Sequence, residues 1–200
     1  MKILFSHYTS GAAVATDLVN TSAHVRTDIG EVLTGPDALT TFLAEHDTRL
    51  DALPPGAAPT TDDLTAVLTL RQETRALLAA TSEDEAVEGA NHLAARATSG
   101  LSLLRDTEDR LQWYVTTAPG ASVADELAAL IGTGLLGVLH TLGHSRFRPC
   151  QSPTCTGLFV DTSKAGRRCY CIPNLCGNRL HVAKHRARQQ ARQQARDASR

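Results

Sequence analysis

The nineteen residues Leu127–Ser145, LAALIGTGLLGVLHTLGHS, carry no charged side chain and decide how the first part of the chain folds. A membrane-spanning helix needs about 20 predominantly apolar residues. Here four glycines, two threonines and two histidines interrupt the leucines. Ser122, a residue type that caps helices, precedes the segment. We therefore interpret it as the buried core helix of a globular domain and expect no membrane span.

Three more helices are predicted upstream of this segment. Pro36 and Asp37 suit the first turn of one helix, because proline has the φ angle of that position and an acidic residue is favoured there. Thr61 is predicted to cap a second helix that continues to Leu78. A third helix is predicted over Ser82–Ala97, where the acidic run SEDEAVE fits a helix start.

The pattern changes between residues 101 and 117, in LSLLRDTEDRLQWYVTT. Apolar and polar residues alternate on both sides of DTED, which predicts a β-hairpin with Leu111, Trp113 and Val115 on one face. The fold class that follows is mainly α, within α+β. We expect a helical N-terminal domain with a small hairpin over residues 1–144 and a second, smaller domain over residues 145–200.

The boundary at residue 145 rests on charge. The chain has a net charge of −1, with 20 Lys and Arg against 21 Asp and Glu. Residues 145–200 hold twelve Lys and Arg against two Asp and Glu, which leaves eight against nineteen in residues 1–144. The C-terminal part therefore carries +10 and the rest −11, a division that favours polyanion binding by the C-terminal part.

All five cysteines lie in this basic part. Cys150 and Cys155 form one C-x4-C pair, Cys171 and Cys176 form another, and Cys169 is left over. Two short chelating loops supply the four tetrahedral corners that zinc prefers, and four thiolates leave no open position for catalysis. Cys169 is a poor partner for Cys171, since alternate residues of an extended chain point to opposite faces. The pattern predicts one structural zinc; free buried thiols or a disulfide are the alternatives.

The C-terminal part resembles the CGNR zinc-finger family. The residues that carry the resemblance are Cys150, Cys155, Phe159, Asp161, Ser163, Lys164, Arg167, Arg168, Cys171 and the run Cys176-Gly177-Asn178-Arg179. Tyr170 stands where family members usually have tryptophan. The run DLVNT, Asp17–Thr21, resembles the start of the ABATE domain, the usual partner of this finger in proposed stress-induced transcription regulators. The resemblance implies a bacterial regulator that binds DNA or RNA.

The sequence after the last cysteine is rich in arginine and glutamine and contains neither proline nor glycine from Arg179 to Arg200, so a basic terminal helix is expected. Its cations would neutralise phosphates. The residues predicted to contact nucleic acid are Arg167, Arg168, Arg179, Lys184, His185, Arg186, Arg188 and Arg192. A solvated helix face, or docking on the acidic domain or on an acidic partner, is the alternative use of this charge.

No catalytic motif is visible. The chain has no glycine-rich phosphate loop, no nucleophile elbow and no histidine pair flanking a glutamate. The polar cluster Asp17, Asn20 and Thr21 is interpreted as a capping or turn network. We therefore expect a protein that is not an enzyme.

The remaining expectations concern location and partners. The start MKILFSHYTS lacks the apolar run of an export signal, which indicates a cytoplasmic protein with reduced thiols. The predicted function is a zinc-containing, nucleic-acid-binding regulator of transcription, with DNA favoured over RNA. An RNA-binding protein and a protein-interaction adaptor stay open, as do a homodimer and an unidentified effector.

Overall fold

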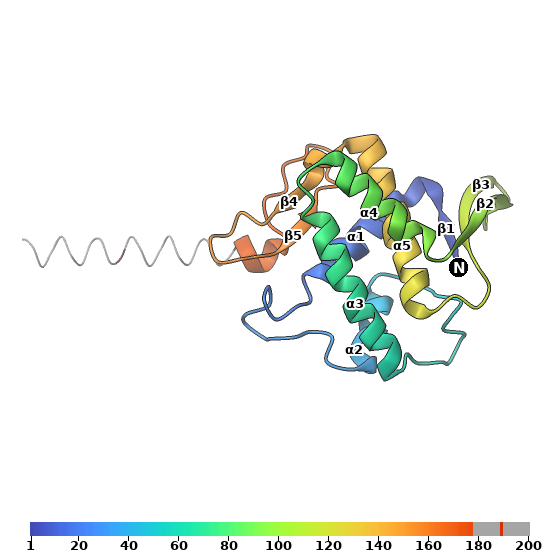
Figure 1. Ribbon diagram of the computed structural model, residues 1–200, viewed down its shortest axis with the longest axis horizontal. Coiled ribbons are helices and arrows are strands. Elements are labelled where there is room, and N and C mark those ends of the chain that lie inside the picture. The colour runs from blue at the N-terminus through green and yellow to red at the C-terminus, as the bar shows by residue number, and fades with distance from the viewer. Residues whose placement is uncertain (178–188, 190–200) are drawn as a thin grey trace, which may run out of the picture.

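The computed structural model describes residues 1–177 and residue 189. Within these residues, five α-helices of ten residues or more and two small sheets make up the fold (Figure 1). The helices are α1 (Tyr8–Val19), α2 (Pro36–Glu45), α3 (Thr61–Leu78), α4 (Glu83–Ala95) and α5 (Val123–Leu142). The strands are β1 (Lys2–Leu4), β2 (Thr98–Arg105), β3 (Leu111–Thr117), β4 (Phe147–Pro149) and β5 (Leu158–Val160). The mainly α class predicted from sequence is confirmed.

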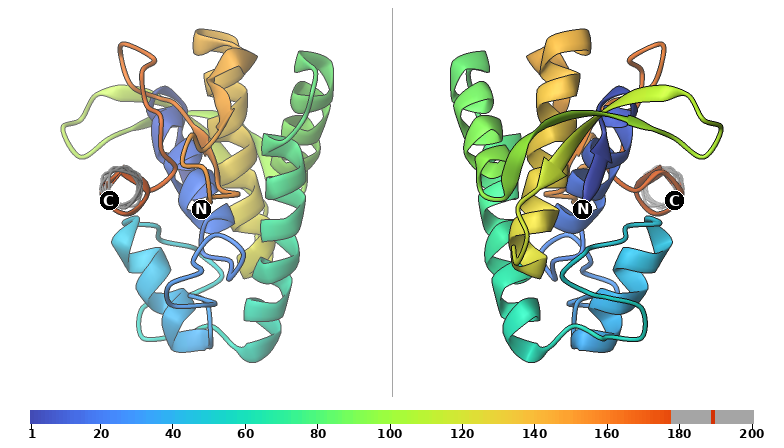
Figure 2. Two further views of the ribbon diagram at one scale, coloured as in Figure 1. Left: turned by 90° about the vertical axis from the view of Figure 1, so that its left-hand side faces the viewer. Right: turned by 90° about the vertical axis from the view of Figure 1, so that its right-hand side faces the viewer.

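Helix α5 is the centre of the bundle and packs against α1, α3 and α4 (Figure 2). It is long and apolar enough to cross a membrane, but 78% of its most apolar 18-residue window is buried inside the protein. Helix α5 is therefore the buried core helix that the sequence predicts.

The glycines of α5 allow its neighbours to approach closely. A Cβ placed on Gly134 would lie 2.6 Å from the Cα of Gly11 and 2.7 Å from the Ala12 nitrogen, both in α1. A Cβ on Gly132 would lie 2.8 Å from the carbonyl oxygen of Ala90 in α4. Backbone atoms cannot move aside as a flexible side chain can. Helix α5 therefore requires glycine at position 134, where it contacts α1, and at position 132, where it contacts α4.

Side-chain caps set the starts of α3, α4 and α5. Thr60 caps α3: its hydroxyl accepts from the Asp63 amide at 3.1 Å, and the Asp63 carboxylate accepts from the Thr60 amide at 2.8 Å. The prediction of Thr61 as the cap was wrong by one residue, because only Thr60 has an acidic residue three positions later to complete the capping box. Ser82 caps α4 in the same way, and Ser122 caps α5.

The first sheet has the antiparallel order β1-β3-β2, so the predicted hairpin is present and gains β1 along its β3 side. The second sheet pairs β4 with β5. Strands β1, β4 and β5 were not predicted. Each is three residues long, too short to display the alternation by which strands are recognised.

A charged side chain is buried within the helical bundle. Glu126 of α5 is 1% exposed. Its carboxylate accepts from the Thr117 hydroxyl at 2.6 Å and from the Ala52 amide at 3.0 Å, and it lies 2.8 Å from the Met1 amino group. A buried charge needs such partners, and here they tie α5 to the end of β3 and to the chain after α2.

Candidate metal centre

The first cysteine pair sits at the end of the β4–β5 hairpin. Cys150 directly follows β4, and its amide donates to the Gly157 carbonyl at 2.8 Å just before β5. Cys155 lies in the turn between them, where its amide donates to Ser152 at 3.0 Å. Glycine is required at position 157, because a side chain there would collide with the Cys171 sulfur. The tight hairpin therefore places both thiols on one side.

The second pair, Cys171 and Cys176, lies in the segment after β5, where the chain returns to the β4–β5 hairpin. Cys171 ends an irregular segment that is fixed by a hydrogen bond from the Gln151 amide to the Cys169 carbonyl, at 2.9 Å. Cys176 lies in the short helical stretch 173–177, and its amide donates to the Ile172 carbonyl at 2.8 Å. This turn carries the Cys176 thiol back towards Cys171.

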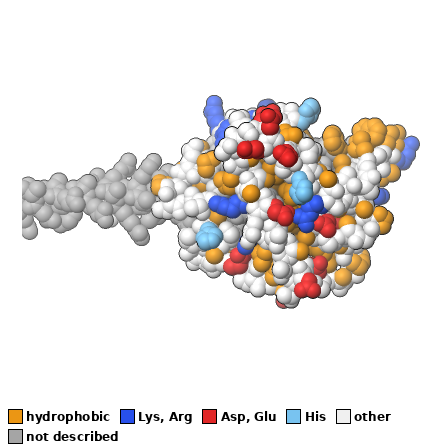
Figure 3. Space-filling model, in the orientation of Figure 1, with side chains coloured by type: hydrophobic (Ala, Val, Ile, Leu, Met, Phe, Trp, Pro, Cys, Tyr) orange, Lys and Arg blue, Asp and Glu red, His pale blue; other side chains and the backbone are white. Residues whose placement is uncertain are grey.

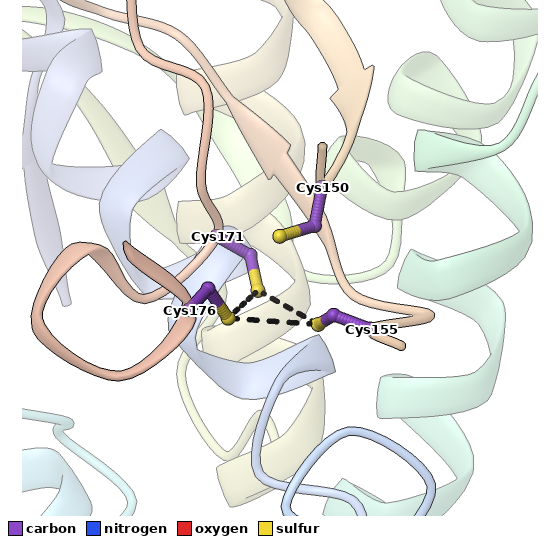
Figure 4. Close-up of side chains that lie close together, drawn as sticks. All are labelled: Cys150, Cys155, Cys171 and Cys176. Atoms are coloured by element: carbon purple, nitrogen blue, oxygen red, sulfur yellow. Dashed lines mark hydrogen bonds between the residues drawn. The ribbon is translucent and has the colours of Figure 1, made fainter. Parts of the chain in front are cut away.

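The four predicted ligands, Cys150, Cys155, Cys171 and Cys176, lie together, with all four sulfur atoms within 4.8 Å of one another (Figure 4). The Sγ–Sγ distances are 3.5 Å for Cys155–Cys171 and 3.7 Å for both Cys171–Cys176 and Cys155–Cys176. Zn–S bonds of about 2.3 Å at tetrahedral angles place sulfurs about 3.8 Å apart. The quartet therefore fits one tetrahedral zinc ion.

Burial makes two of these thiols, those of Cys171 and Cys176, poor acids without a cation. Cys171 is 1% exposed and Cys176 is fully buried. Burial raises the pKa of Cys176 to about 11, and burial together with the neighbouring Cys155 raises the pKa of Cys171 further above its ordinary value. A bound divalent cation supplies the charge that holds such thiols as thiolates, so metal binding and folding of this segment are coupled.

Cys169 lies outside the quartet. It is half-buried, and its thiol donates to the Arg167 carbonyl at 3.3 Å. The spacing argument that preferred Cys171 to Cys169 agrees with this placement.

Asp161 organises the loop that joins the two pairs. Its fully buried carboxylate accepts from the Ser163 amide and the Arg168 amide, both at 3.0 Å, and lies 3.2 Å from the Arg148 guanidinium. Burial alone would raise the pKa of Asp161, but these hydrogen bonds and the nearby arginine hold it below its ordinary value. The Asp, Ser and Arg residues of the motif thus brace the chain between the metal ligands, which is how outer-shell groups orient a metal site.

Arg168 has an internal role that the sequence did not indicate. Its guanidinium donates to the Tyr170 carbonyl at 2.9 Å and to the Cys171 carbonyl, and it lies 4.9 Å from the centre of the Phe159 ring. These contacts hold the second cysteine segment over β5. Contact of Arg168 with a phosphate stays a prediction, as does that of Arg167, whose side chain is exposed.

The metal centre is packed directly on the helical bundle through α1. The Thr16 hydroxyl accepts from the Val160 amide at 3.0 Å, and the Asn20 side-chain amide donates to the carbonyls of Thr16 and Leu158, each at 2.6 Å. Thr16 and Asn20 are 1% and 2% exposed. Asn20, interpreted from sequence as part of a capping network, does end α1, but it also clamps β5 to that helix.

Apolar contacts reinforce this junction. Val25, which follows α1, is 1% exposed and packs with Cys150, Cys171 and Cys176. Val160 of β5 is equally buried but belongs to the core of the bundle. Sequence reasoning missed both residues. Val25 lies in no motif, Val160 is the unspecified position between Phe159 and Asp161, and each reaches a partner more than 100 positions away.

The other predicted nucleic-acid contacts lie outside the described residues. They are Arg179, Lys184, His185, Arg186, Arg188 and Arg192. The expected basic terminal helix falls on the same part of the chain, of which the structure describes only residue 189.

Comparison with known protein families gives two matches. Residues 12–135 match the ABATE family, described as "Putative stress-induced transcription regulator", and residues 146–189 match the CGNR zinc finger. No match among curated proteins was found. The CGNR match and the geometry of the four cysteines agree on one structural zinc.

Proposed function

This chain belongs to the ABATE family and carries a CGNR zinc finger, and on that basis we propose that it is a cytoplasmic, DNA-binding regulator of transcription. In this proposal the zinc site fixes the start of the basic C-terminal segment, and that segment binds phosphates. The observation that carries the proposal is the position of Cys176. It is a zinc ligand within the helical stretch 173–177, three residues before the first arginine of the basic run.

The charge distribution supports this use. Residues 145–200 carry twelve Lys and Arg against two Asp and Glu, while the bundle before them is acidic. Among the described residues, Arg146 and Arg148 donate to carbonyls of the finger itself and flank Asp161. Lys164 and Arg167 are exposed on the same loop. A polyanion would therefore meet these two side chains and the arginines that follow the finger.

The chemistry of the centre argues against catalysis. A catalytic zinc keeps one coordination position for water or substrate, whereas four thiolates fill the tetrahedron. We propose that this zinc serves only to hold the fold, so that regulation depends on binding.

The test is selection of DNA by the full zinc-loaded chain at physiological salt. Fragmented genomic DNA is incubated with the protein, and the bound fragments are recovered and sequenced. A shared motif is expected. Uniform recovery would indicate a phosphate clamp without sequence reading, and preference for RNA at the same salt would indicate an RNA-binding protein.

A matched pair of variants sharpens this test. Arg192→Ala should reduce the steepness of the log–log dependence of affinity on salt by about 0.9, the value for one phosphate contact. Arg49→Ala removes the same charge from a side chain that is 92% exposed in the loop after α2, and it should leave the slope unchanged. Equal slopes for both variants and the parent would contradict a role for Arg192. If the protein bound no polyanion in a salt-dependent way but captured another protein, a protein-interaction adaptor would be favoured.

A further inference from the structure

One apolar surface of the molecule has no partner among the described residues. Five large side chains on or beside the β2–β3 hairpin are about half exposed, and we call them the apolar stripe: Phe5 at 55%, Leu101 at 58%, Leu103 at 46%, Leu111 at 55% and Trp113 at 51%. Figure 3 shows hydrophobic side chains gathered over the end of the molecule where this hairpin lies. Trp113 is the single tryptophan of the chain.

Strand register places the four hairpin residues of the stripe on one face, and Phe5 directly follows the neighbouring strand β1. Leu103 lies opposite Trp113, and Leu111 lies opposite Arg105. Residues directly opposite each other, and those two positions along, share a face of a sheet. The next row on this face contains Leu101 and Val115, and then Ile3 of β1, which is 5% exposed in the core. The same face of the sheet thus packs on the core at Ile3 and is exposed at the stripe, where the hairpin extends beyond the core.

An exposed apolar face of this kind is costly for a lone hairpin. A two-stranded ribbon is marginally stable in water unless its apolar face is covered. A contiguous exposed apolar patch of several hundred Å² marks an interaction site more often than an ordinary surface. Tryptophan and other large aromatic residues also dominate the binding energy at interfaces. The stripe therefore has the composition of an interface centre.

The charges around the stripe are compensated within the hairpin. At its tip, Arg105 lies 3.4 Å from the Asp109 carboxylate, and Arg110 lies 3.1 Å from Asp106 and 3.0 Å from Glu108. Two copies of the hairpin would not bring uncompensated like charges together. The same pairing leaves the stripe without the free cations that a nucleic acid requires.

We propose that the apolar stripe is the dimer interface of this protein, covered by the stripe of a second copy across a two-fold axis. Half-exposed side chains of this size present about 100 Å² each, so the stripe offers roughly 500 Å² per copy. Two copies then bury about 1,000 Å², which is the lower limit for a specific interface. An interface of this size favours a reversible dimer.

The location of the stripe gives this dimer a definite form. The hairpin and the metal centre lie at opposite ends of the molecule (Figure 1). Two copies joined by their hairpins would therefore carry their metal centres at the two far ends. Dimer formation does not depend on the proposed DNA binding, and either can fail without the other.

Trp113 allows a direct experiment, because its fluorescence reports on the stripe alone. The emission of the zinc-loaded full chain is recorded over a wide concentration series, with the mass measured by sedimentation at the same points. A shift of the emission to shorter wavelength, in step with a change from monomer to twice the monomer mass, is expected. A monomeric mass and unshifted emission throughout would overturn the proposal.

Variants then locate the interface. Leu103→Thr with Leu111→Thr keeps strand-forming residues and the tryptophan but removes two apolar contacts from each copy. The protein concentration at the midpoint of the monomer–dimer transition should rise on the order of tenfold or more. Ile29→Thr is the control, since Ile29 is 62% exposed outside the stripe and should leave the midpoint unchanged. An unchanged midpoint in the double variant would show that the copies meet elsewhere and would also overturn the proposal.

Discussion

The helical bundle and the metal centre are held together by different means. The bundle has a continuous apolar core around α5, with helices in backbone contact at Gly132 and Gly134. The metal centre has a small buried cluster in which three of the five residues are cysteines, and a buried carboxylate, Asp161, takes the place of further apolar contacts. A segment this small cannot bury enough apolar surface to fold alone. The comparison shows that packing fixes one region, whereas a metal and a polar network fix the other.

The junction between them belongs to both regions. Val160 is in the core of the bundle, and Val25 is in the cluster around the cysteines. Each region therefore supplies a buried residue to the other. Three predictions measure how far the stability of the bundle and that of the metal centre are independent, beginning with the change of largest expected effect.

Loss of zinc should unfold the metal centre and leave the bundle folded but weakened. Zinc supplies about 10–16 kcal/mol of apparent binding free energy in small zinc modules. We expect Cys176→Ser to lose the ion and the structure around it, and to abolish any DNA binding. The bundle should still melt cooperatively, but at a lower temperature than in the parent, because Val160 and Thr16 lose their partners. Zinc content and thermal unfolding followed by circular dichroism are the measurements.

Cys169→Ser is the matched control for this change. It removes the one thiol that lies outside the quartet and should leave both zinc content and melting temperature unchanged. Loss of zinc from this variant, or an unaltered melting temperature in Cys176→Ser, would contradict the division of roles.

Filling the contact between α1 and α5 should weaken the bundle alone. Gly134→Ala places a Cβ 2.6 Å from the Gly11 Cα, so the helices must separate, at a cost of about 1–3 kcal/mol for overpacking. The better helix propensity of alanine returns only about 1 kcal/mol. A lower free energy of unfolding, with normal zinc content, is expected in denaturant titrations.

Gly89→Ala in α4 tests the reason for that effect. Its Cβ would meet only the flexible tip of Leu77, at 2.9 Å. We expect it to be near neutral, since the side chain can move and the helix gains propensity. Equal destabilisation by the two substitutions would show that backbone contact is not what matters at Gly134.

The third prediction concerns the junction between the two regions. Thr16→Val keeps the shape of the side chain but leaves the buried Val160 amide without an acceptor, which should lower the free energy of unfolding by about 1–3 kcal/mol. Thr74→Val is the comparison, because Thr74 is fully buried and its hydroxyl has no hydrogen-bond partner. That substitution should be neutral or stabilising. The same loss in both variants would mean that burial of a hydroxyl, and not the clamp, decides the result.

The sequence predicted the parts of this fold that depend on local pattern or on residue identity. The core helix, its cap at Ser122 and the hairpin follow from apolar spacing and capping chemistry, and the four zinc ligands follow from paired spacing of cysteines. The junction could not be predicted in this way. Thr16 and Asn20 meet β5 only because the chain returns there after more than 130 residues, and an isolated polar residue in a helix gives no indication of such a partner.

The guanidinium of Arg168 illustrates the same difficulty within the site. An arginine beside zinc ligands in a basic segment suggests phosphate binding, yet this one donates to the carbonyls of Tyr170 and Cys171. Charge alone does not distinguish a side chain that faces a ligand from one that braces its own loop.

The clamp of α1 on β5 also bears on how such a protein evolves. Transfer of residues 145–200 to another chain would expose Val160 and leave the Val160 amide without the Thr16 hydroxyl, so the transferred piece would lose part of its support. We therefore expect recombination to move the two regions together, and substitutions at residues 16, 20 and 25 to co-vary with those at residues 157–160 in descendants of a common ancestor.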